Sequence, residues 1–424
     1  MSKHVTQQVK TLAGMGLAIL LLPHSVSAQT GDLLGGDDFL FNSSEIDSVE
    51  SHWSDGLKTT LEHSHTETTE ATREQRSHLR LEFETGFAGG WFIRLDTRYR
   101  YFWSEDRLAE NRGNYGKNEW QNAWLQYSHN SCAAKVGRQT LIWGTVEGTF
   151  VTDIITPFDY TEQLLTDFGN VREPQDMLVG DCFFGADQVQ VFFTPEAKTD
   201  VLQHEPLALS LAPGAPPISL DVDAGQEWGL RYKWSREGYD ISAMYARLFS
   251  NTPTLVMAQG AQLPTAELSE FDMYGLGVSI ARGRLLIKGE AAFKTEQLVS
   301  LSNETTDQID VALGFEYTTQ DNHAVSAGLW SRYQDNDVVE HQQIGGATLS
   351  WRKPYLNDNL IMSLLGNWAS EPRFLSLTIF AEYQWDDYWS SSLALGTASL
   401  SKAAQTIPFL TTDDYVTAGI KYEF

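Results

Sequence analysis

The last ten residues of the chain, YVTAGIKYEF (415–424), alternate apolar and polar side chains. A β-strand repeats every two residues, so Val416, Ala418, Ile420, Tyr422 and Phe424 fall on one face and the polar residues between them on the other. In a soluble sandwich the apolar face would point into a core. In a membrane barrel it would point at lipid, with the polar face toward a wet lumen. These ten residues leave both structures open.

Length and composition narrow the choice of protein class. The chain has 424 residues, which is too many for one ordinary soluble core. Acidic residues number 56 and basic residues 30, a formal net charge of −26. Without a basic surplus to neutralise phosphates, nucleic acid is not expected as a partner. Aromatic residues make up 12% of the chain. That content fits either a large all-β core or aromatic girdles at two lipid–water interfaces.

The first 28 residues have the pattern of a secretory signal peptide. Lys3 and Lys10 precede the apolar stretch LAGMGLAILLLP (12–23), and VSA (26–28) places small side chains before Gln29. An acidic segment, 29–55, follows, and we expect it in the periplasm. No later stretch has the roughly 18 apolar residues of a transmembrane helix. A secreted chain of this kind is either soluble or crosses the outer membrane as a closed barrel.

From Gly56 to the end, alternating segments are joined in turn by tight turns and longer connections. HLRLEFETGF (78–87), for example, turns at AGG into WFIRLDTRYRYFW (91–103). We count about 18 such strands (16–18), an even number as bacterial barrels require, with short periplasmic turns and longer extracellular loops. A propeller would show a repeat for each blade, and none is present. Two or three sandwich domains would be joined by linkers, and we find none. The sequence therefore predicts one all-β domain, an antiparallel transmembrane β-barrel over 56–424.

Two motifs resemble those of a known class. KVGRQTLIWG (135–144), followed by TDIITPFD (152–159), resembles the alginate-export-type barrels and their uncharacterised relatives. The chain end with Tyr422 and Phe424 resembles the terminal signal read by the barrel-assembly machinery. Over most of the mature chain, the sequence resembles a Gram-negative outer-membrane porin. This resemblance implies a place in the outer membrane, with its lipid and the assembly machinery as partners.

If the apolar face meets lipid, the charged residues of the strands line the lumen, because a charge on the lipid face costs about 2–4 kcal/mol at the midplane. The predicted pore-lining residues are Arg80, Glu82, Glu84, Arg94, Asp96, Arg98, Arg100, Arg231, Lys233, Lys288, Glu290, Lys294 and Lys421. One interpretation is a basic ladder that favours anions or acidic sugars. The other is that Arg and Glu of neighbouring strands pair and hold a wet wall together, as is common where inward charges have both signs.

The longest unpatterned connection, 145–175, follows a strand in which neither face is clean. Val136 and Arg138 share one face, whereas Leu141 and Trp143 share the other, and a bulge would reconcile them. The pattern does not say which way Arg138 points. The connection contains many apolar residues, whose exposure to water would be unfavourable. We expect this insert to fold into the barrel and narrow the passage. The alternative is an external loop packed on itself.

The two cysteines, Cys132 and Cys182, lie beside tight turns of two consecutive strands. Both should therefore lie at the periplasmic ends of neighbouring strands, in a compartment where disulfides persist. We expect a disulfide, which in the entropic model constrains the unfolded chain by about 4 kcal/mol. The alternative is two free thiols.

Patterns that would indicate catalysis are sparse. HSH (63–65) puts two imidazoles on one strand face, but no carboxylate or Cys partner is marked as a third metal ligand. No nucleophile motif or acid/base pair stands out. We expect no catalytic site, metal or cofactor. The sequence predicts a channel that passes a small polar or acidic solute across the outer membrane. One alternative is a barrel that serves as outer-membrane partner of an envelope export system, and the other is an outer-membrane enzyme.

Overall fold

The structure is a computed structural model that describes residues 56–69, 73–105, 115–159, 172–201, 208–209, 218–219, 222–261, 263–335, 342–371, 373–401 and 414–424. The predicted signal peptide, 1–28, and the acidic segment, 29–55, lie outside the described residues. Within the described ranges, no helix has the length and apolar character needed to cross a membrane.

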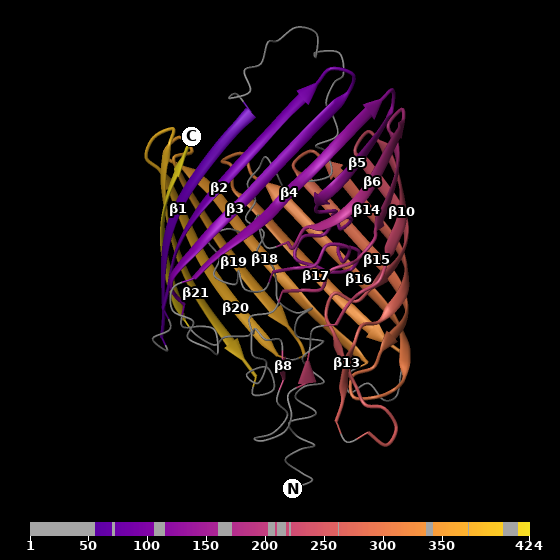
Figure 1. Cartoon of the computed structure of the whole chain (residues 1–424). Helices are drawn as coiled ribbons and strands as arrows, with labels where there is room; N and C mark the ends of the chain where they lie inside the picture. The colour runs from indigo at the N-terminus through magenta and orange to yellow at the C-terminus, as the bar shows by residue number, and fades with distance from the viewer. Residues whose placement is uncertain are drawn as a thin grey trace.

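Eighteen antiparallel strands form the wall of a closed barrel. They are β1 (Leu57–Thr68), β2 (Arg73–Phe87), β3 (Trp91–Glu105), β4 (Tyr115–His129), β5 (Cys132–Gln139), β6 (Gln175–Phe184), β7 (Asp187–Thr194), β10 (Glu227–Arg236), β11 (Tyr239–Phe249), β14 (Glu270–Arg282), β15 (Leu285–Leu298), β16 (Thr305–Thr318), β17 (Ala324–Gln334), β18 (Gln343–Tyr355), β19 (Leu360–Ala369), β20 (Phe374–Gln384), β21 (Trp389–Leu400) and β22 (Tyr415–Glu423). Each strand pairs with the next along the wall, and the strands tilt steeply across it (Figure 1).

The chain ends meet at the seam of the barrel. β22 pairs with β1 in antiparallel register, so the barrel wall, as described by the structure, has no open edge. The terminal residue completes this pairing: Phe424 donates its N–H to the carbonyl of Thr59 at 3.0 Å, and its own carbonyl accepts from the Thr59 N–H at 2.7 Å. The sequence prediction of a closed barrel is confirmed, with a strand number at the upper end of the predicted range.

Short turns and most of the longer connections lie at opposite ends of the barrel; the short connections 69–72 and 370–373, at the end of the longer ones, are the exceptions. Tight turns such as β6–β7 and β14–β15 share the end at which the chain terminates, and the longer connections lie at the other end (Figure 1). Two short hairpins lie within the longer connections. They are formed by β8 (Ala208–Leu209) with β9 (Ile218–Ser219) and by β12 (Thr254–Val256) with β13 (Thr265–Glu267). The alternation of turns and loops therefore follows the sequence prediction.

Apolar side chains face outward and polar ones inward. In β16, Ile309 and Leu313 are about half exposed, whereas Gln308 and Asp310 on the opposite face are buried. A soluble protein would show the reverse arrangement, because exposed apolar surface is costly in water. The outer face is suited to lipid, and charges gather inside.

The predicted bulge between Lys135 and Trp143 is wrong. The pairing of β5 with β4 and β6 shows no register shift. β5 instead ends at Gln139, and the chain leaves the wall, so Leu141 and Trp143 become buried inside the barrel. The mixed parity marks the point where a strand becomes a lumenal segment. Arg138 lies on the outer face of β5, where its guanidinium pairs with Asp176 at 3.1 and 2.9 Å.

Candidate functional site

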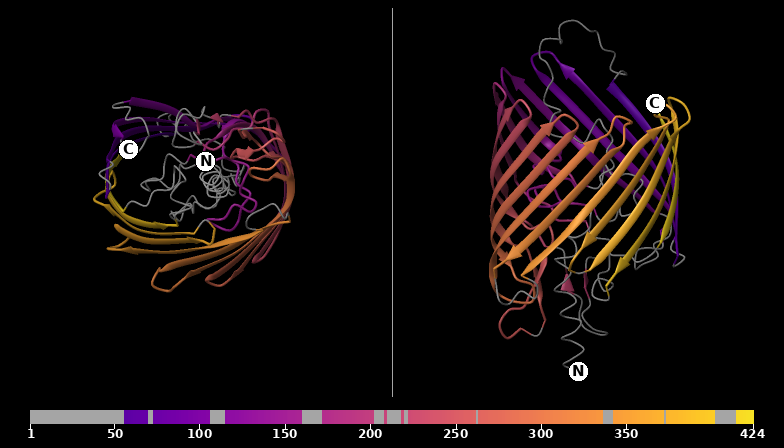
Figure 2. Two further views of the ribbon diagram at one scale, coloured as in Figure 1. Left: turned by 90° about the horizontal axis from the view of Figure 1, so that it is seen from below. Right: turned by 180° about the vertical axis from the view of Figure 1, so that it is seen from behind.

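The described part of the insert, 145–159 with 172–175, lies inside the ring of strands. Figure 2 shows this segment within the barrel outline, toward the strands drawn in magenta and orange. It enters beside β7, where the indole N–H of Trp143 donates to Gln190 Oε1 at 2.7 Å. The Trp143 ring also packs edge-on against Phe192, with ring centroids 5.3 Å apart. The prediction that the insert folds into the barrel is therefore confirmed for these residues, and its narrowing of the passage stays a prediction.

From Trp143 the insert follows the inner wall as far as β18 and then returns. Near its far end, Glu147 pairs with Lys288 of β15 at 3.5 Å, and Gly148 lies against Thr348 of β18. On the way back, the carbonyl of Phe150 accepts from Lys294 of β15 at 3.3 Å. The carbonyl of Ile154 accepts from Asn251, in the connection after β11, at 3.1 Å. The insert thus lies along one side of the barrel.

Small residues make room for the insert on that side. A Cβ added to Gly229 of β10 would lie 2.8 Å from the Trp143 ring, and one added to Gly275 of β14 would lie 3.1 Å from the Thr152 methyl. At Gly314 of β16 the added carbon would lie 3.0 Å from a Val146 methyl. Since these approaches exclude larger side chains, the three glycines form the floor of a groove, here called the insert groove.

An apolar cluster fills the space between the insert and the wall. Its members from the insert and the residues before it are Leu141, Trp143, Val146, Val151 and Ile155, and its members from the wall are Met177, Val179, Phe192, Met244, Ala246, Leu248, Phe271, Met273, Ala292 and Ala312. The inner face of β6 to β16 is therefore partly apolar, unlike an ordinary wet lumen. Burial of these side chains stabilises the insert in place.

The inner faces of β2, β3 and β4 carry the predicted basic ladder, and its arginines are paired. Arg80 forms a bidentate pair with Asp96 at 2.9 and 2.7 Å. Arg98 and Arg100 both donate to Glu119 of β4, at 3.2 and 2.5 Å. Arg94 lies 3.9 Å from Glu82 and 4.0 Å from Glu84, and its side chain is 29% exposed. Arg94 is thus the most exposed of the four arginines, and Arg98 and Arg100 are almost completely buried.

The remaining predicted lumen residues lie on the same inner face of their strands but do not gather into one site. Lys288, Glu290 and Lys294 contact the insert from β15. Arg231 lies under Trp143, with its guanidinium 5.8 Å from the ring centroid. Lys233 pairs with Asp240 at 3.6 Å, and Lys421 pairs with Glu382 at 3.5 Å. Charges of both signs are spread around the inner wall.

Sequence reasoning missed several partners of these groups. Glu119 was not assigned to the lumen, because a register shift beside it, at Asp96/Thr97, breaks the parity of β4. Asp310 of β16 binds both Lys294, at 2.6 Å, and Arg332 of β17, at 2.8 Å. The alternation of β16 contains the signal for Asp310, since its neighbours Ile309 and Val311 are apolar.

The described residues contain no group of three metal-ligating side chains. His63 Nδ1 hydrogen-bonds the Ser77 hydroxyl at 2.8 Å, and His65 Nε2 lies 3.4 Å from Glu67. Two imidazoles with one carboxylate at the edge of hydrogen-bond reach do not form a coordination sphere.

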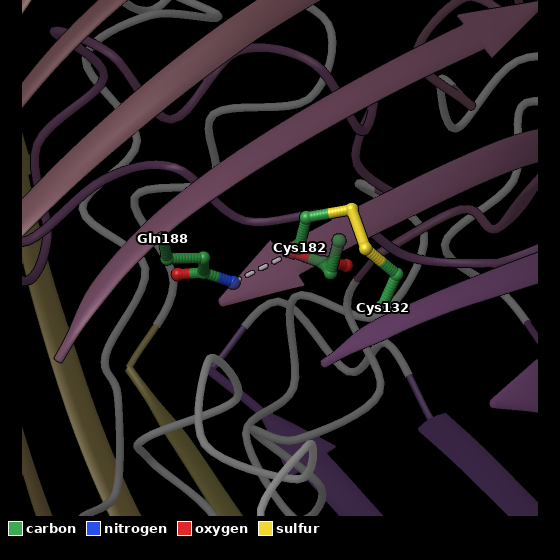
Figure 3. The surroundings of a disulfide bond; sticks show 4 residues. Cys132, Cys182 and Gln188 are labelled. Atoms are coloured by element: carbon green, nitrogen blue, oxygen red, sulfur yellow. Dashed lines mark hydrogen bonds between the residues drawn. A yellow bond between two sulfur atoms is a disulfide. The ribbon is translucent and has the colours of Figure 1, made fainter. Parts of the chain in front are cut away.

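A disulfide joins Cys132 and Cys182, as predicted. The two residues are direct partners in the β5–β6 register, close to the tight-turn end of both strands (Figure 3). Both have the parity of the exposed Val136 and Leu178, so the bond lies on the outer face. On the inner face of the wall, the amide of Gln188 in β7 donates to Asp181 of β6 at 2.6 Å. The disulfide connects the two strands between which the insert leaves and rejoins the wall.

Solved structures with a similar fold include proteins from two bacteria. OccK8 (OprE) of Pseudomonas aeruginosa matches with a TM-score of 0.56 at 9% identity, over 87% of this chain and 98% of that one. OpdK of the same organism, solved with vanillate, matches with a TM-score of 0.55 at 10% identity and the same coverage. OccAB3 of Acinetobacter baumannii matches with a TM-score of 0.53 at 11% identity, again over 87% and 98%. Another OpdK structure is described as an outer-membrane protein. At these identities the likeness extends to the fold alone.

The family-model and curated-protein searches returned no match for this chain.

Proposed function

We propose that this chain is an outer-membrane channel that passes a small polar or acidic solute. The observation that carries the proposal is the unequal use of the lumen. The insert packs along the wall from β7 to β18 and also reaches β3, where Asp159 pairs with Arg100, whereas the described inner faces of β2 to β4 carry polar and charged side chains. In such a barrel, one side of the lumen is filled by the insert and the other side is polar. The polar side can bind a hydrated solute while the lumen stays open.

An acidic solute is favoured by the arginines that face this passage. A guanidinium stays charged at any working pH and can hold a carboxylate through two parallel hydrogen bonds. Arg94 is the best placed of them, since its side chain is 29% exposed, whereas those of Arg98 and Arg100 are 2% exposed. Vanillate, found with OpdK, is a small carboxylate, and its presence in a protein of the same fold supports this solute class.

The proposal includes an outer-membrane location, reached after cleavage of the predicted signal peptide at 1–28. It assigns outer-membrane lipid to the exposed apolar face and the barrel-assembly machinery to the chain end at Tyr422 and Phe424. The tight turns would then face the periplasm and the long connections the outside. The resemblance of 135–144 and 152–159 to alginate-export-type barrels adds acidic sugars to the candidate solutes.

Single-channel recording in planar bilayers tests the proposal. Purified protein should give discrete conductance steps, and small carboxylates or acidic sugar oligomers should block the current in a concentration-dependent way. A neutral solute of matched size is the control. Folded protein that inserts but gives no conductance would overturn the channel proposal and favour the export-partner alternative.

A further inference from the structure

Five hydrogen bonds from the insert converge on one carboxylate of the wall, that of Glu290 in β15. Its Oε1 accepts from the backbone N–H of Thr145, from the N–H of Val146 at 2.5 Å and from the Thr145 hydroxyl at 3.0 Å. Its Oε2 accepts from the N–H of Thr152 at 3.2 Å and from the Thr152 hydroxyl at 2.8 Å. The carboxylate thus connects the outgoing and returning arms of the insert.

The surroundings of Glu290 leave its carboxylate to the insert. In the strand register its neighbours are Gly277 of β14 and Ala312 of β16, which bring no polar side chain to it. The residue is only 5% exposed. The nearest charged residues on the same face of β15, Lys288 and Lys294, have their own acidic partners in Glu316 and Asp310. A buried carboxylate is stabilised by such a set of N–H donors.

β15 is therefore the strand on which the insert docks. Lys288, Glu290 and Lys294 follow one another on its inner face and contact Glu147, both arms of the insert and Phe150, respectively. The apolar cluster beside them also favours burial of the insert, but apolar contacts have no direction. Hydrogen bonds have a fixed geometry, so they determine the position of the insert along and across the wall.

We propose that Glu290 is the positioning residue of the channel, because its carboxylate holds the insert against β15 and so sets the width of the passage. This inference rests on the proposed function and adds to it the residue that controls the passage. Glu290 need not touch the solute. Its effect on conduction passes through the position of residues 145–152.

The first test replaces Glu290 with Ala and, separately, with Gln. Ala removes all five acceptor contacts, whereas Gln keeps the shape but turns an N–H₂ group toward N–H donors. We expect both variants to conduct more than wild type, with a noisier open current, because the insert no longer keeps one position. Glu382→Gln is the matched control. Glu382 is another lumenal carboxylate, with a side chain 23% exposed, but it pairs with Lys421 on the wall.

A cross-link provides the second test. A Cβ built at Gly314 lies 3.7 Å from the Cβ of Val146, close to the mean Cβ separation of a disulfide, about 3.8 Å. Val146→Cys with Gly314→Cys should therefore fix the insert to β16 without Glu290. In the Glu290→Ala background, the oxidised double-cysteine variant should return to wild-type conductance, and the reduced one should conduct like Glu290→Ala. Wild type with and without reductant controls for the native disulfide.

Limited proteolysis provides a measurement that does not need conduction. Glu290→Ala should be cut within 145–159 under conditions in which wild type and Glu382→Gln resist. Heat-modifiability on gels should show that the variant barrel is folded. Wild-type conductance together with wild-type protease resistance in Glu290→Ala would overturn the inference. If wild type itself does not conduct but the protease result holds, the channel proposal is wrong and the docking role of Glu290 stands.

Discussion

The carboxylate of Asp159 lies 3.5 Å from Nη2 of Arg100, and both side chains are almost completely buried. Asp159 belongs to the insert and Arg100 to the inner face of β3, so this ion pair joins the returning end of the insert to the basic ladder. Arg100 also binds Glu119, which it shares with Arg98. The arginine nearest the insert therefore has a structural task, and solute contact falls more readily to the other members of the ladder.

Arg94 and Arg98 should differ when each is changed to Ser. Arg94 is 29% exposed, so Arg94→Ser removes a positive charge that the solute can reach. We expect the reversal potential in a salt gradient to shift toward cations, with little change in heat stability. Arg98 is 2% exposed, and Arg98→Ser removes the hydrogen bond that Arg98 donates to Glu119. We expect this loss to lower the stability of the barrel by about 1–3 kcal/mol.

Gel mobility after graded heating and bilayer reversal potentials separate these two effects. Equal shifts in selectivity from both variants would contradict the assignment of solute contact to Arg94. Unchanged selectivity in both variants would mean that the ladder is purely structural.

The alternation of apolar and polar residues was enough to predict the barrel, because each wall strand can be recognised from its own sequence. The alternation also fixes the register of each strand, since a shift of one residue would turn the apolar face of that strand inward. The cysteine pair could be predicted for a similar reason, since both residues lie next to recognisable turns. The partners of Arg98 and Arg100 could not, because they depend on a register shift in β4 that follows from tertiary packing.

The side of the barrel that the insert covers can be recognised in the sequence by small residues at inward positions. The alternation of apolar and polar residues alone does not reveal it. Gly275 and Gly314 lie at inward positions, where a polar lumen would normally have longer side chains. Small inward residues in neighbouring strands indicate that another segment packs there. The role of Glu290 had no such signal, because its partners are backbone N–H groups more than a hundred residues away in sequence.

Gly229→Ala should disturb the insert groove. The added Cβ would lie 2.6 Å from the Phe192 ring, 2.8 Å from the Trp143 ring and 2.8 Å from the Tyr245 carbonyl. Overpacking of this kind costs about 1–3 kcal/mol. We expect a lower heat-dissociation temperature and a changed conductance, because Trp143 must move.

Gly366→Ala is the matched control for this variant, since its added Cβ would meet its nearest neighbour at 3.8 Å, an ordinary contact. If the two variants behave alike in thermal melts and in bilayers, the groove does not constrain the insert.

Asp200 should make the packing of the insert depend on pH. This residue lies in the connection after β7, and its carboxylate accepts from the N–H of Phe158 at 2.8 Å and from the Thr252 hydroxyl at 2.6 Å. Burial raises the pKa of Asp200 from 3.8 to about 6. The raised pKa means that the packed state prefers the neutral acid, so the packing is weakest above pH 6 and gains stability as pH falls from about 6 toward 4.

Protease resistance of the insert, measured from pH 7.5 to 4.5 with an acid-tolerant protease, checks this expectation. Resistance should increase below about pH 6 in wild type, and Asp200→Asn should remove that pH step, since an amide does not titrate. A pH step of the same size in Asp200→Asn would assign the effect to another group.

Phe424 should have two separable effects at the seam of the barrel. Its backbone exchanges two hydrogen bonds with Thr59 of β1, and its exposed ring lies 5.3 Å from that of Tyr422. Phe424→Ala keeps the backbone bonds and removes the aromatic signal, whereas deletion of Phe424 removes both. We expect lower outer-membrane levels for both variants, with unfolded protein in the periplasm. Only the deletion should also lower the heat stability of the fraction that inserts.

Fractionation and heat-modifiability gels measure these two quantities. Normal membrane levels of both variants would argue against Phe424 as an assembly signal.

The Cys132–Cys182 bond should stabilise the part of the wall from which the insert leaves. It closes a loop with a sequence separation of 50 residues. In the entropic model, a loop of this length stabilises the folded state by about 4 kcal/mol relative to the reduced chain. Because β5 and β6 flank the insert, their separation would release both of its ends. We expect Cys132→Ser with Cys182→Ser to lower the heat-dissociation temperature, and reductant to have the same effect on wild type but none on the double variant. Mass spectrometry of a non-reduced digest should show the linked peptides. Free thiols in freshly extracted, folded protein would contradict the bond.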